Sequence, residues 1–364
     1  MRPAHALIDL AALRHNYLLT RQLHGKRVLA VVKANAYGHG AVRCALALAD
    51  IADAFAVGFV DEALELRAAG IRTPILVLEG VFDVVELDEA ARHQLWIAVH
   101  HEAQLQMIER SSLTVPLQVW LKFNTGMNRA GFAAGELATI WQRLQASGKV
   151  AAITLMSHLA RADEPQQSAT STQIERFEQL CAPYPAARSL ANSAGMLYWP
   201  SARLDWGRPG LLLYGIAPDD GSEQEVDIGL QPVMQLGSAV MAVRDIEAGE
   251  AVGYGGHFIA SKPTRVGLVA MGYADGYPRS VANGTPVWVS DPAHPAGGQF
   301  AHTLGRVSMD MLSIDLSALP WAGIGSKVEL WGRKVSVNQV ARAADTIAYE
   351  LLCNVKRVKF SASV

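Results

Sequence analysis

The N-terminal part of the chain alternates between two hydrophobic patterns. Short runs of β-branched and small apolar residues, typical of buried strands in a parallel sheet, are followed by stretches with apolar residues at helical spacing. The expected strands are Val28–Lys33, Ala54–Phe59, Ile75–Glu79, Leu95–Val99, Leu117–Lys122, Ala152–His158, Arg188–Ala191 and Arg203–Trp206. The expected helices are a first one from Leu10 to about Leu23, capped by Asp9, and then Ala41–Ala49, Asp61–Ala69, Val84–Arg92, Glu102–Glu109, Ala134–Ala146 and Thr172–Cys181. Strands that alternate with helices in this way predict a closed (β/α)8 barrel of the TIM type rather than an open doubly wound sheet.

The pattern changes near Pro232. A polar, glycine-containing stretch at 219–228 precedes this point and is expected to be a linker. The strand-like runs beyond it follow one another without intervening helices, and they are Gln235–Val243, Thr264–Met271, Pro286–Val289, Met311–Asp315 and Lys327–Leu330. One late helix is expected from about Val337 to Leu352. The chain is therefore predicted to be an α/β protein, with a barrel over residues 1–230 and a mostly β domain over residues 231–364.

Composition and charge narrow the functional classes. The 364 residues are 50% hydrophobic and 18% charged, and the formal net charge of −2 comes without a run of lysines and arginines. A nucleic acid or a membrane surface is therefore not expected as a partner. The three cysteines form no CxxC pair, so neither a metal site nor a disulfide framework is expected. Because no signal peptide and no long apolar run is found, the chain is expected in the cytoplasm.

Polar residues gather where the expected barrel strands end. Lys33 ends the first strand and Tyr37 lies in the loop after it, while Lys122 and His158 end the fifth and sixth strands and Arg129 follows the fifth. In a barrel, these strand ends meet at the active face. Burial there lowers the pKa of a lysine and makes its amine nucleophilic enough to form a Schiff base. The alternative for Lys33 is an ammonium group that simply reaches solvent.

The loops after the seventh and eighth strands predict a phosphate site. Ser193 follows the seventh strand, and Arg208, Gly210 and Leu211 follow the eighth. Barrel enzymes commonly hold a phosphate at these two loops with hydroxyl and backbone N–H groups. A phosphate site together with a reactive lysine indicates pyridoxal 5'-phosphate, whose aldehyde would join Lys33 and whose phosphate would anchor the other end.

Each of these residues also has a structural alternative. Arg129 and Arg208 could be ordinary ion-pair partners at the end of a barrel, and His158 could be a core histidine. Ser193 could be a plain turn residue. Lys122 follows an apolar run and needs a partner, which could be a structural carboxylate. Their position at one end of one predicted barrel favours a shared site over this set of unrelated roles.

At this point the chain resembles the alanine racemases, a family of fold-type III pyridoxal phosphate enzymes. The resemblance extends in the family's order over nearly the whole chain. It rests on the blocks Ala30-Val-Val-Lys-Ala-Asn-Ala-Tyr-Gly-His-Gly40, Lys122-Phe-Asn-Thr-Gly-Met-Asn-Arg-Ala-Gly131, Ala191-Asn-Ser-Ala-Gly195, Val252-Gly-Tyr-Gly255, Gly272-Tyr-Ala-Asp-Gly-Tyr277 and Gly305-Arg-Val-Ser-Met-Asp310. The family implies a barrel followed by a β domain, in a homodimer whose active sites are shared between subunits.

The resemblance also implies roles for individual residues. Lys33 would carry the cofactor and act as the base on the D-alanine side, and Tyr254 would be the opposing base for L-alanine. Arg129 and the backbone of Met309 would hold the substrate carboxylate, and Arg208 would donate a hydrogen bond to the pyridine nitrogen. The phosphate would be bound by Tyr37, Ser193, Gly210 and Leu211. His158 would support Tyr254 or Arg208. Further supporting residues would be Lys122, Tyr273 and Asp310. Lys122 matches a lysine that can be carbamylated in this family, which would give Arg129 an anionic partner.

Two segments depart from the family pattern. The segment 290–302 is longer than the usual connection and is expected to be a surface insertion. The tail from Cys353 to Lys359 lacks a tyrosine that lines the substrate entrance and helps to bind phosphate in some members. Details of the access channel and of cofactor affinity are therefore expected to differ.

Three other functions remain as alternatives. The first is a broad-specificity amino-acid racemase of the same fold, with a roomier pocket. The second is a non-catalytic pyridoxal phosphate carrier, but such a protein needs neither a second domain nor the Tyr254 motif. The third is a decarboxylase of the related fold, for which an acidic partner at the pyridine nitrogen would be expected in place of Arg208.

Overall fold

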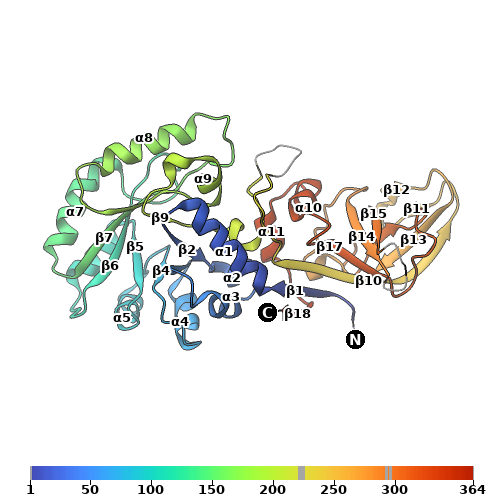
Figure 1. The fold of residues 1–364 in the computed structure, drawn as a ribbon, viewed down its shortest axis with the longest axis horizontal. Helices are drawn as coiled ribbons and strands as arrows, with labels where there is room; N and C mark the ends of the chain where they lie inside the picture. Colours follow the sequence, from blue (N-terminus) through green and yellow to red (C-terminus); the bar gives the residue numbers. More distant parts are fainter. Residues whose placement is uncertain (1, 220–225, 292–293, 295–296, 364) are drawn as a thin grey trace. The chain divides into compact units, whose positions relative to one another are not determined.

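The computed structural model describes residues 2–219, 226–291, 294 and 297–363. These residues form two compact units (Figure 1). One unit is Leu13–Leu230, and the other combines Met1–Ala12 with Gln231–Val364.

The unit Leu13–Leu230 is a barrel of parallel strands. Its strands are β2 (Arg27–Val31), β3 (Ala54–Val57), β4 (Ile75–Val77), β5 (Trp96–Val99), β6 (Leu117–Lys122), β7 (Val150–Met156), β8 (Ala187–Ser189) and β9 (Trp206–Gly207). They follow the order β8-β7-β6-β5-β4-β3-β2-β9, and a parallel bridge between Asn192 and Arg208 joins the two ends. All residues of β3 and β4 are buried, as strands covered on both faces must be. This unit confirms the predicted TIM-type fold.

Helices of the barrel unit follow its strands and lie outside them (Figure 1). After α1 (Leu10–His24), they are α3 (Ala41–Leu48), α4 (Val60–Ala68), α5 (Val84–Arg92), α6 (Glu102–Arg110), α7 (Leu137–Ala146), α8 (Ala169–Cys181) and α9 (Ser193–Tyr198). The short segment α2 (Lys33–Tyr37) has non-helical φ and ψ values at Ala34, Asn35 and Ala36. Asp9 caps α1 as expected, because its Oδ1 accepts a hydrogen bond from the Ala12 N–H at 2.9 Å.

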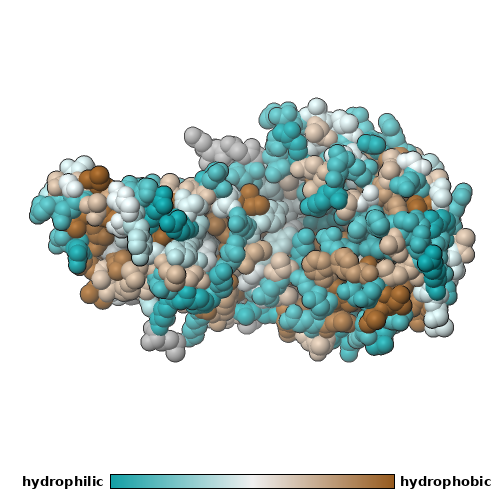
Figure 2. All heavy atoms as spheres, turned by 180° about the vertical axis from the view of Figure 1, so that it is seen from behind, coloured by the Kyte–Doolittle hydropathy of each residue, from teal (hydrophilic) through white to brown (hydrophobic). Residues whose placement is uncertain are grey.

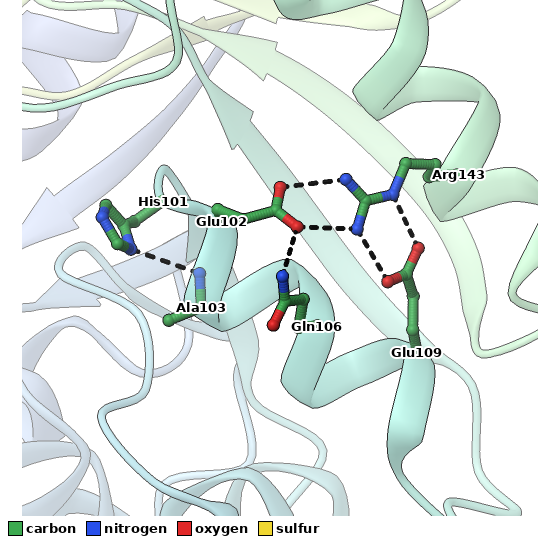
Figure 3. A network of polar contacts seen from close by, with 6 residues as sticks. All are labelled: His101, Glu102, Ala103, Gln106, Glu109 and Arg143. Atoms are coloured by element: carbon green, nitrogen blue, oxygen red, sulfur yellow. Dashed lines mark hydrogen bonds and ion pairs between the residues drawn. The ribbon is translucent and has the colours of Figure 1, made fainter.

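Arg143 of α7 joins two glutamates of α6 (Figure 3). Its Nη1 and Nη2 contact the Glu102 carboxylate at 2.9 and 2.8 Å, and its Nε and Nη2 contact that of Glu109, both at 2.8 Å. These hydrogen bonds raise the pKa of Arg143 and lower the pKa of both carboxyl groups. Because all three side chains are partly exposed, solvent screening limits the stabilisation to about 1 kcal/mol.

The second unit is mostly β, as predicted. Its main sheet has the order β13-β16-β15-β14-β17-β10-β1-β18. The strands are β1 (His5–Asp9), β10 (Met234–Ile246), β13 (Thr264–Val269), β14 (Pro286–Ser290), β15 (Gln299–Leu304), β16 (Leu312–Asp315), β17 (Lys327–Trp331) and β18 (Lys359–Ser363), and the small hairpin is β11 (Ala251–Val252) with β12 (Phe258–Ile259).

The first residues of the chain belong to this β unit, so the expectation that the barrel domain begins at residue 1 is wrong. Strand β1 pairs antiparallel with β10, where Ala6 lies opposite Leu236, and parallel with β18, where Ala6 lies opposite Phe360. Ala6 is fully buried there. The backbone hydrogen bonds of β1 therefore hold it in the sheet.

The prediction of a single late helix from about Val337 to Leu352 is also wrong. Two helices, α10 (Val337–Ala343) and α11 (Ala348–Cys353), replace it. Asp345 lies between them with a φ of 54°, a left-handed conformation that a right-handed helix cannot contain.

The segment 290–302 is not wholly an insertion. Residues 299–302 belong to β15, which forms an antiparallel hairpin with β14. Positions 292–293 and 295–296 lie outside the described residues, as do positions 220–225 of the expected linker.

Hydrophilic side chains cover most of the face drawn in Figure 2, with apolar side chains scattered among them. Within the described ranges, no helix combines the length and the apolar character needed to cross a bilayer.

Candidate active site

The segment after β2 is a left-handed turn, which the sequence did not reveal. The strand ends at Val31, and Lys33 begins the turn. The four residues that follow, Ala34 to Tyr37, have φ values between 51° and 54°. Each non-glycine residue in this conformation costs roughly 1–2 kcal/mol, so surrounding contacts must hold the turn. Strain of this kind is concentrated at functional sites, and here it lies directly beside the candidate nucleophile.

The Tyr214 ring packs against Tyr37, and a third ring packs against Tyr214. The ring centroids of Tyr37 and Tyr214 are 4.9 Å apart, and His39 stacks on Tyr214 at 4.4 Å. The Tyr214 hydroxyl donates to the carbonyl of Val31 at 2.8 Å, which anchors this stack to the end of β2. Tyr214 carried no recognisable sequence signal, because it lies far along the chain from the turn that it supports.

Ser193, Gly210 and Tyr37 meet at the ends of three barrel segments. The Ser193 hydroxyl accepts hydrogen bonds from the N–H groups of Gly210 at 2.8 Å and Leu212 at 3.4 Å. A methyl group on Gly210 would lie 2.4 Å from the Tyr37 hydroxyl, so only glycine permits this close approach. Leu211, between the two N–H donors, is buried. The structure therefore brings together all four residues expected to bind phosphate.

Arg208 is buried beside this cluster, with 4% of its surface exposed. Its Nη1 donates to the Ser189 hydroxyl, and its Nη2 donates to the carbonyls of Ser157 at 2.6 Å and Leu190 at 3.2 Å. Burial lowers the pKa of the guanidinium to about 10, so it stays protonated at neutral pH. Within the described part of the chain, its Nε–H has no acceptor. The arrangement leaves this charged N–H group to donate to a ligand.

His158 lies two residues beyond β7 and contacts Arg208, as expected for a barrel-end residue. The distance between His158 Nδ1 and Arg208 Nη2 is 3.3 Å. Burial lowers the pKa of His158 well below its usual value, and the positive charges of Arg208 and Arg129 lower it further. The imidazole is therefore neutral at neutral pH.

Lys122 ends β6 and is only 6% exposed. Burial lowers the pKa of its ammonium group to about 8; Glu79 opposes this shift, and the positive charges of Arg208, Arg129 and Lys33 reinforce it. The same three cations also influence His158. Four cationic side chains thus share one end of the barrel, which suits an anionic ligand.

The other candidate residues lie in the β unit. The backbone joins the Tyr273 and Met309 segments: the Tyr273 N–H donates to the Ser308 carbonyl at 3.1 Å, and the Ala274 N–H donates to the Met309 carbonyl at 3.0 Å. Next to Met309, Asp310 accepts a hydrogen bond from Arg357 at 2.9 Å.

Tyr254 stands apart from that cluster. It lies in the turn 254–256, and 71% of its surface is exposed. Among the described residues, no hydrogen bond joins it to Tyr273, Met309 or Asp310. The Met309 side chain is also 53% exposed. Two large side chains of the candidate site are thus open to a ligand or to another chain.

Family models identify both parts of the chain. The model for the alanine racemase N-terminal domain matches residues 8–218, and the model for the C-terminal domain matches residues 233–361. The chain is 62% identical over 360 residues to the alanine racemase of Azoarcus sp., with 99% of each chain covered. It is 56% identical over 358 residues to the catabolic alanine racemase of Pseudomonas putida, with 98% of each covered.

Solved structures agree with these matches. The biosynthetic alanine racemase of Pseudomonas aeruginosa superposes with a TM-score of 0.94 at 44% identity, covering 100% of both chains. The alanine racemase of Bartonella henselae with covalently bound pyridoxal phosphate has a TM-score of 0.86 at 28% identity, again over 100% of both chains. These similarities extend over both units. The chain belongs to the alanine racemase family.

Proposed function

We propose that this chain interconverts L-alanine and D-alanine with pyridoxal 5'-phosphate, using Lys33 and Tyr254 as bases on opposite faces of the substrate. The observation that carries this proposal is the meeting of a lysine, a phosphate cradle and a buried arginine at one end of the barrel. Full-length similarity to alanine racemases supports the substrate.

The residues present fit the cofactor. Both acceptor positions of the Ser193 hydroxyl are taken by backbone N–H groups, so its own O–H is left to donate to a phosphate oxygen. The Tyr37 hydroxyl lies beside the same cradle. Arg208 can direct its Nε–H to the pyridine nitrogen, and Lys33 supplies the amine. When bound, pyridoxal phosphate supplies the electron sink that makes removal of an amino-acid α-proton feasible.

Inversion requires a proton to leave one face of the α-carbon and another to arrive on the opposite face. Two bases that flank the carbon meet this requirement. Lys33 would take the proton from D-alanine and return one to the same face, and Tyr254 would do the same for L-alanine.

Arg208 would control the pyridine ring. A guanidinium donates hydrogen bonds and cannot accept them. A pyridine nitrogen held by Arg208 would therefore be the acceptor and would stay unprotonated. Arg208 would in this way weaken the electron sink that the cofactor supplies and disfavour side reactions such as transamination and decarboxylation.

Arg129 and the Met309 N–H would hold the substrate carboxylate. Among the described residues, the Met309 N–H has no acceptor, and a carboxylate oxygen would satisfy it. The pKa of about 8 leaves part of the Lys122 amine neutral. A neutral amine attacks the carbon of CO2 and releases one proton, giving a carbamate anion. The anion would hold Arg129 in position.

A second copy of the chain would complete the site. Tyr254 and Met309 expose 71% and 53% of their surfaces in the single chain, and a catalytic base needs a water-poor environment. We infer a homodimer with shared active sites, located in the cytoplasm, with no nucleic acid or membrane partner. Tyr273 and Asp310 would support the Met309 segment.

Incubation of the purified protein with L-alanine in D2O tests this proposal. Optical rotation should disappear while NMR shows deuterium at the α-carbon. With the Lys33→Ala variant, the optical rotation should persist and no deuterium should be incorporated. Equal rates with serine, lysine and arginine would favour a broad-specificity racemase instead. Bound cofactor without exchange of any amino acid would favour a pyridoxal phosphate carrier.

A further inference from the structure

The left-handed turn at 34–37 joins two parts of the proposed cofactor site. Lys33 precedes it, and Tyr37, whose hydroxyl lies beside Gly210, ends it. The conformation of this turn therefore sets the position of the lysine relative to the phosphate cradle. Four consecutive non-glycine residues do not hold this conformation by themselves.

One carboxylate ties this turn to the next barrel loop. The Oε1 of Glu62 accepts a hydrogen bond from the Ala34 N–H at 2.6 Å. Its Oε2 accepts from the N–H groups of Gly58 at 2.7 Å and Phe59 at 3.2 Å. Both residues follow β3, and a Cβ added at Gly58 would lie 3.9 Å from the Cβ of Lys33. Glu62 thus connects the segment after β2 with the segment after β3, at the base of the candidate nucleophile.

The turn has other supports further from the lysine. The Nδ1 of buried His39 donates to the carbonyls of Ala36 at 2.9 Å and Tyr37 at 3.0 Å. The side-chain oxygen of Asn35 accepts from the Ala41 N–H at 2.9 Å. These contacts fix the end of the turn near Tyr37. Of the side chains described, Glu62 is the one that bonds the backbone directly after Lys33.

We propose that Glu62 is a positioning residue for Lys33. Its carboxylate keeps the left-handed turn in place so that the lysine amine and the Tyr37 hydroxyl point to one ligand. This inference rests on the proposed function only in that Lys33 binds the cofactor. It assigns Glu62 no contact with substrate or cofactor.

The alternative is that Glu62 merely caps a helix. It is the third residue of α4, and a glutamate in this position commonly bonds the N-terminal backbone. Glu86 provides a matched control, because it is the third residue of α5 and accepts a hydrogen bond from the Phe82 N–H at 2.8 Å. Glu86 has no contact with the turn among the described residues.

The substitution Glu62→Gln preserves size but removes one acceptor. The amide NH2 of the glutamine must face either the Ala34 N–H or the N–H groups of Gly58 and Phe59. No hydrogen bond forms in either case, because both groups are donors. Losing a charge-assisted hydrogen bond in this place should weaken pyridoxal phosphate binding roughly tenfold to hundredfold. Glu62→Asp, whose carboxylate cannot reach both loops, should show a similar loss.

The experiment compares wild type, Glu62→Gln, Glu62→Asp and Glu86→Gln in the full chain. Cofactor affinity is measured by absorbance titration, the fraction of Lys33 trapped with borohydride is measured by mass spectrometry, and amide exchange of residues 33–40 is measured in cofactor-free protein. We expect both Glu62 variants to exchange faster in this peptide and to bind and trap less cofactor, with Glu86→Gln like the wild type. The inference is overturned if Glu62→Gln and Glu86→Gln behave alike in all three.

Failure of the proposed function would look different. A wild-type protein that traps cofactor at Lys33 but racemises no amino acid would refute the racemase assignment, while the comparison of Glu62→Gln with Glu86→Gln would still decide the role of Glu62.

Discussion

The Nη2 atom of Arg208 lies 3.3 Å from the Nδ1 atom of His158, and this contact favours one tautomer of the histidine. Nη2 shares its two hydrogens with the carbonyls of Ser157 and Leu190, and because a guanidinium only donates, the contact is favourable when Nδ1 accepts and the proton of the neutral ring is on Nε2. Burial beside Arg208 holds the pKa of His158 well below its usual value, which agrees with this assignment. His158 can thus offer its Nε2–H to a second group without becoming charged.

Buried neutral histidines predict that the protein loses stability in acid. Burial lowers the pKa of His24 and His39 to about 4, and it lowers the pKa of His158 in the same direction. An unfolded histidine has a pKa near 6.5, so below this pH the unfolded chain binds protons that the folded chain excludes. The free energy of unfolding should therefore be fully retained above pH 6.5. Towards pH 4 it should fall by up to about 1.4 kcal/mol per pH unit for each histidine.

Urea denaturation at pH 7.5 and pH 5.0 measures this loss. In His24→Leu, which cannot take up the proton, the difference between the two pH values should shrink. A wild-type midpoint that is the same at both pH values would contradict the expectation.

Ser193→Ala should weaken cofactor binding without unfolding the barrel. The change removes the hydroxyl proposed to donate to the phosphate and leaves the Gly210 and Leu212 N–H groups without their acceptor. We expect the dissociation constant for pyridoxal phosphate to rise roughly tenfold to hundredfold, as measured by absorbance titration. Ser147→Ala is a control, because its hydroxyl also accepts from a backbone N–H, that of Lys149 at 3.1 Å, and donates to the Leu144 carbonyl, at the end of α7. Equal affinities in the two variants would show that Ser193 is a turn residue.

Tyr254→Phe should affect proton removal from L-alanine and from D-alanine differently. Removing one general base should slow racemisation by roughly 10²–10⁴-fold. Lys33 should still exchange the α-proton of D-alanine with D2O, whereas exchange from L-alanine should be lost; NMR of each enantiomer measures both rates. The variant Tyr349→Phe, in α11 of the same unit, should behave like the wild type. Equal exchange of both enantiomers by Tyr254→Phe would mean that another group serves as the second base.

Lys122 should react with carbon dioxide in a pH-dependent manner. With a pKa of about 8, its neutral amine fraction rises from about one-tenth at pH 7 to about nine-tenths at pH 9. The carbamate signal in 13C NMR with labelled bicarbonate should rise over this range and be absent in Lys122→Met. That variant should also raise the KM for alanine more than it lowers kcat, because Arg129 would lose its anionic partner. A carbamate signal that persists in Lys122→Met would assign the reaction to another amine.

Local patterns predicted the parts of the fold that depend on local burial. Strand β6 (Leu117–Lys122) and helix α5 (Val84–Arg92) have their predicted bounds, because each combines a clear period with a distinct end. Strand β1 was missed because its partners, β10 and β18, lie more than two hundred residues away in the sequence. Contacts over such distances leave no periodic signal nearby.

In the candidate site, too, features set by the local pattern were predicted, and features set by contacts between distant segments were missed. Lys33, Ser193 and Arg208 were found because strand ends of a barrel converge on one face, whatever the loops between them do. The left-handed turn was missed because alanine and tyrosine have no preference for positive φ, and the contact with Glu62 that supports it comes from another loop. Two side chains that depend on tertiary contacts, Glu62 and Tyr214, were missed for the same reason.

The pairing of β1 with β18 makes the barrel an insertion within the β unit, and this has a consequence during synthesis. The ribosome delivers β1 first and its parallel partner, Lys359–Ser363, last. Residues 13–230 can therefore fold while the opening strand still lacks both neighbours. A chain released before residue 359 would present an unpaired strand edge, which is a common starting point for aggregation. If a linker long enough to run back along this parallel pair joined the two termini, and the chain were opened in a loop of the barrel, β18 and β1 would be synthesised one after the other.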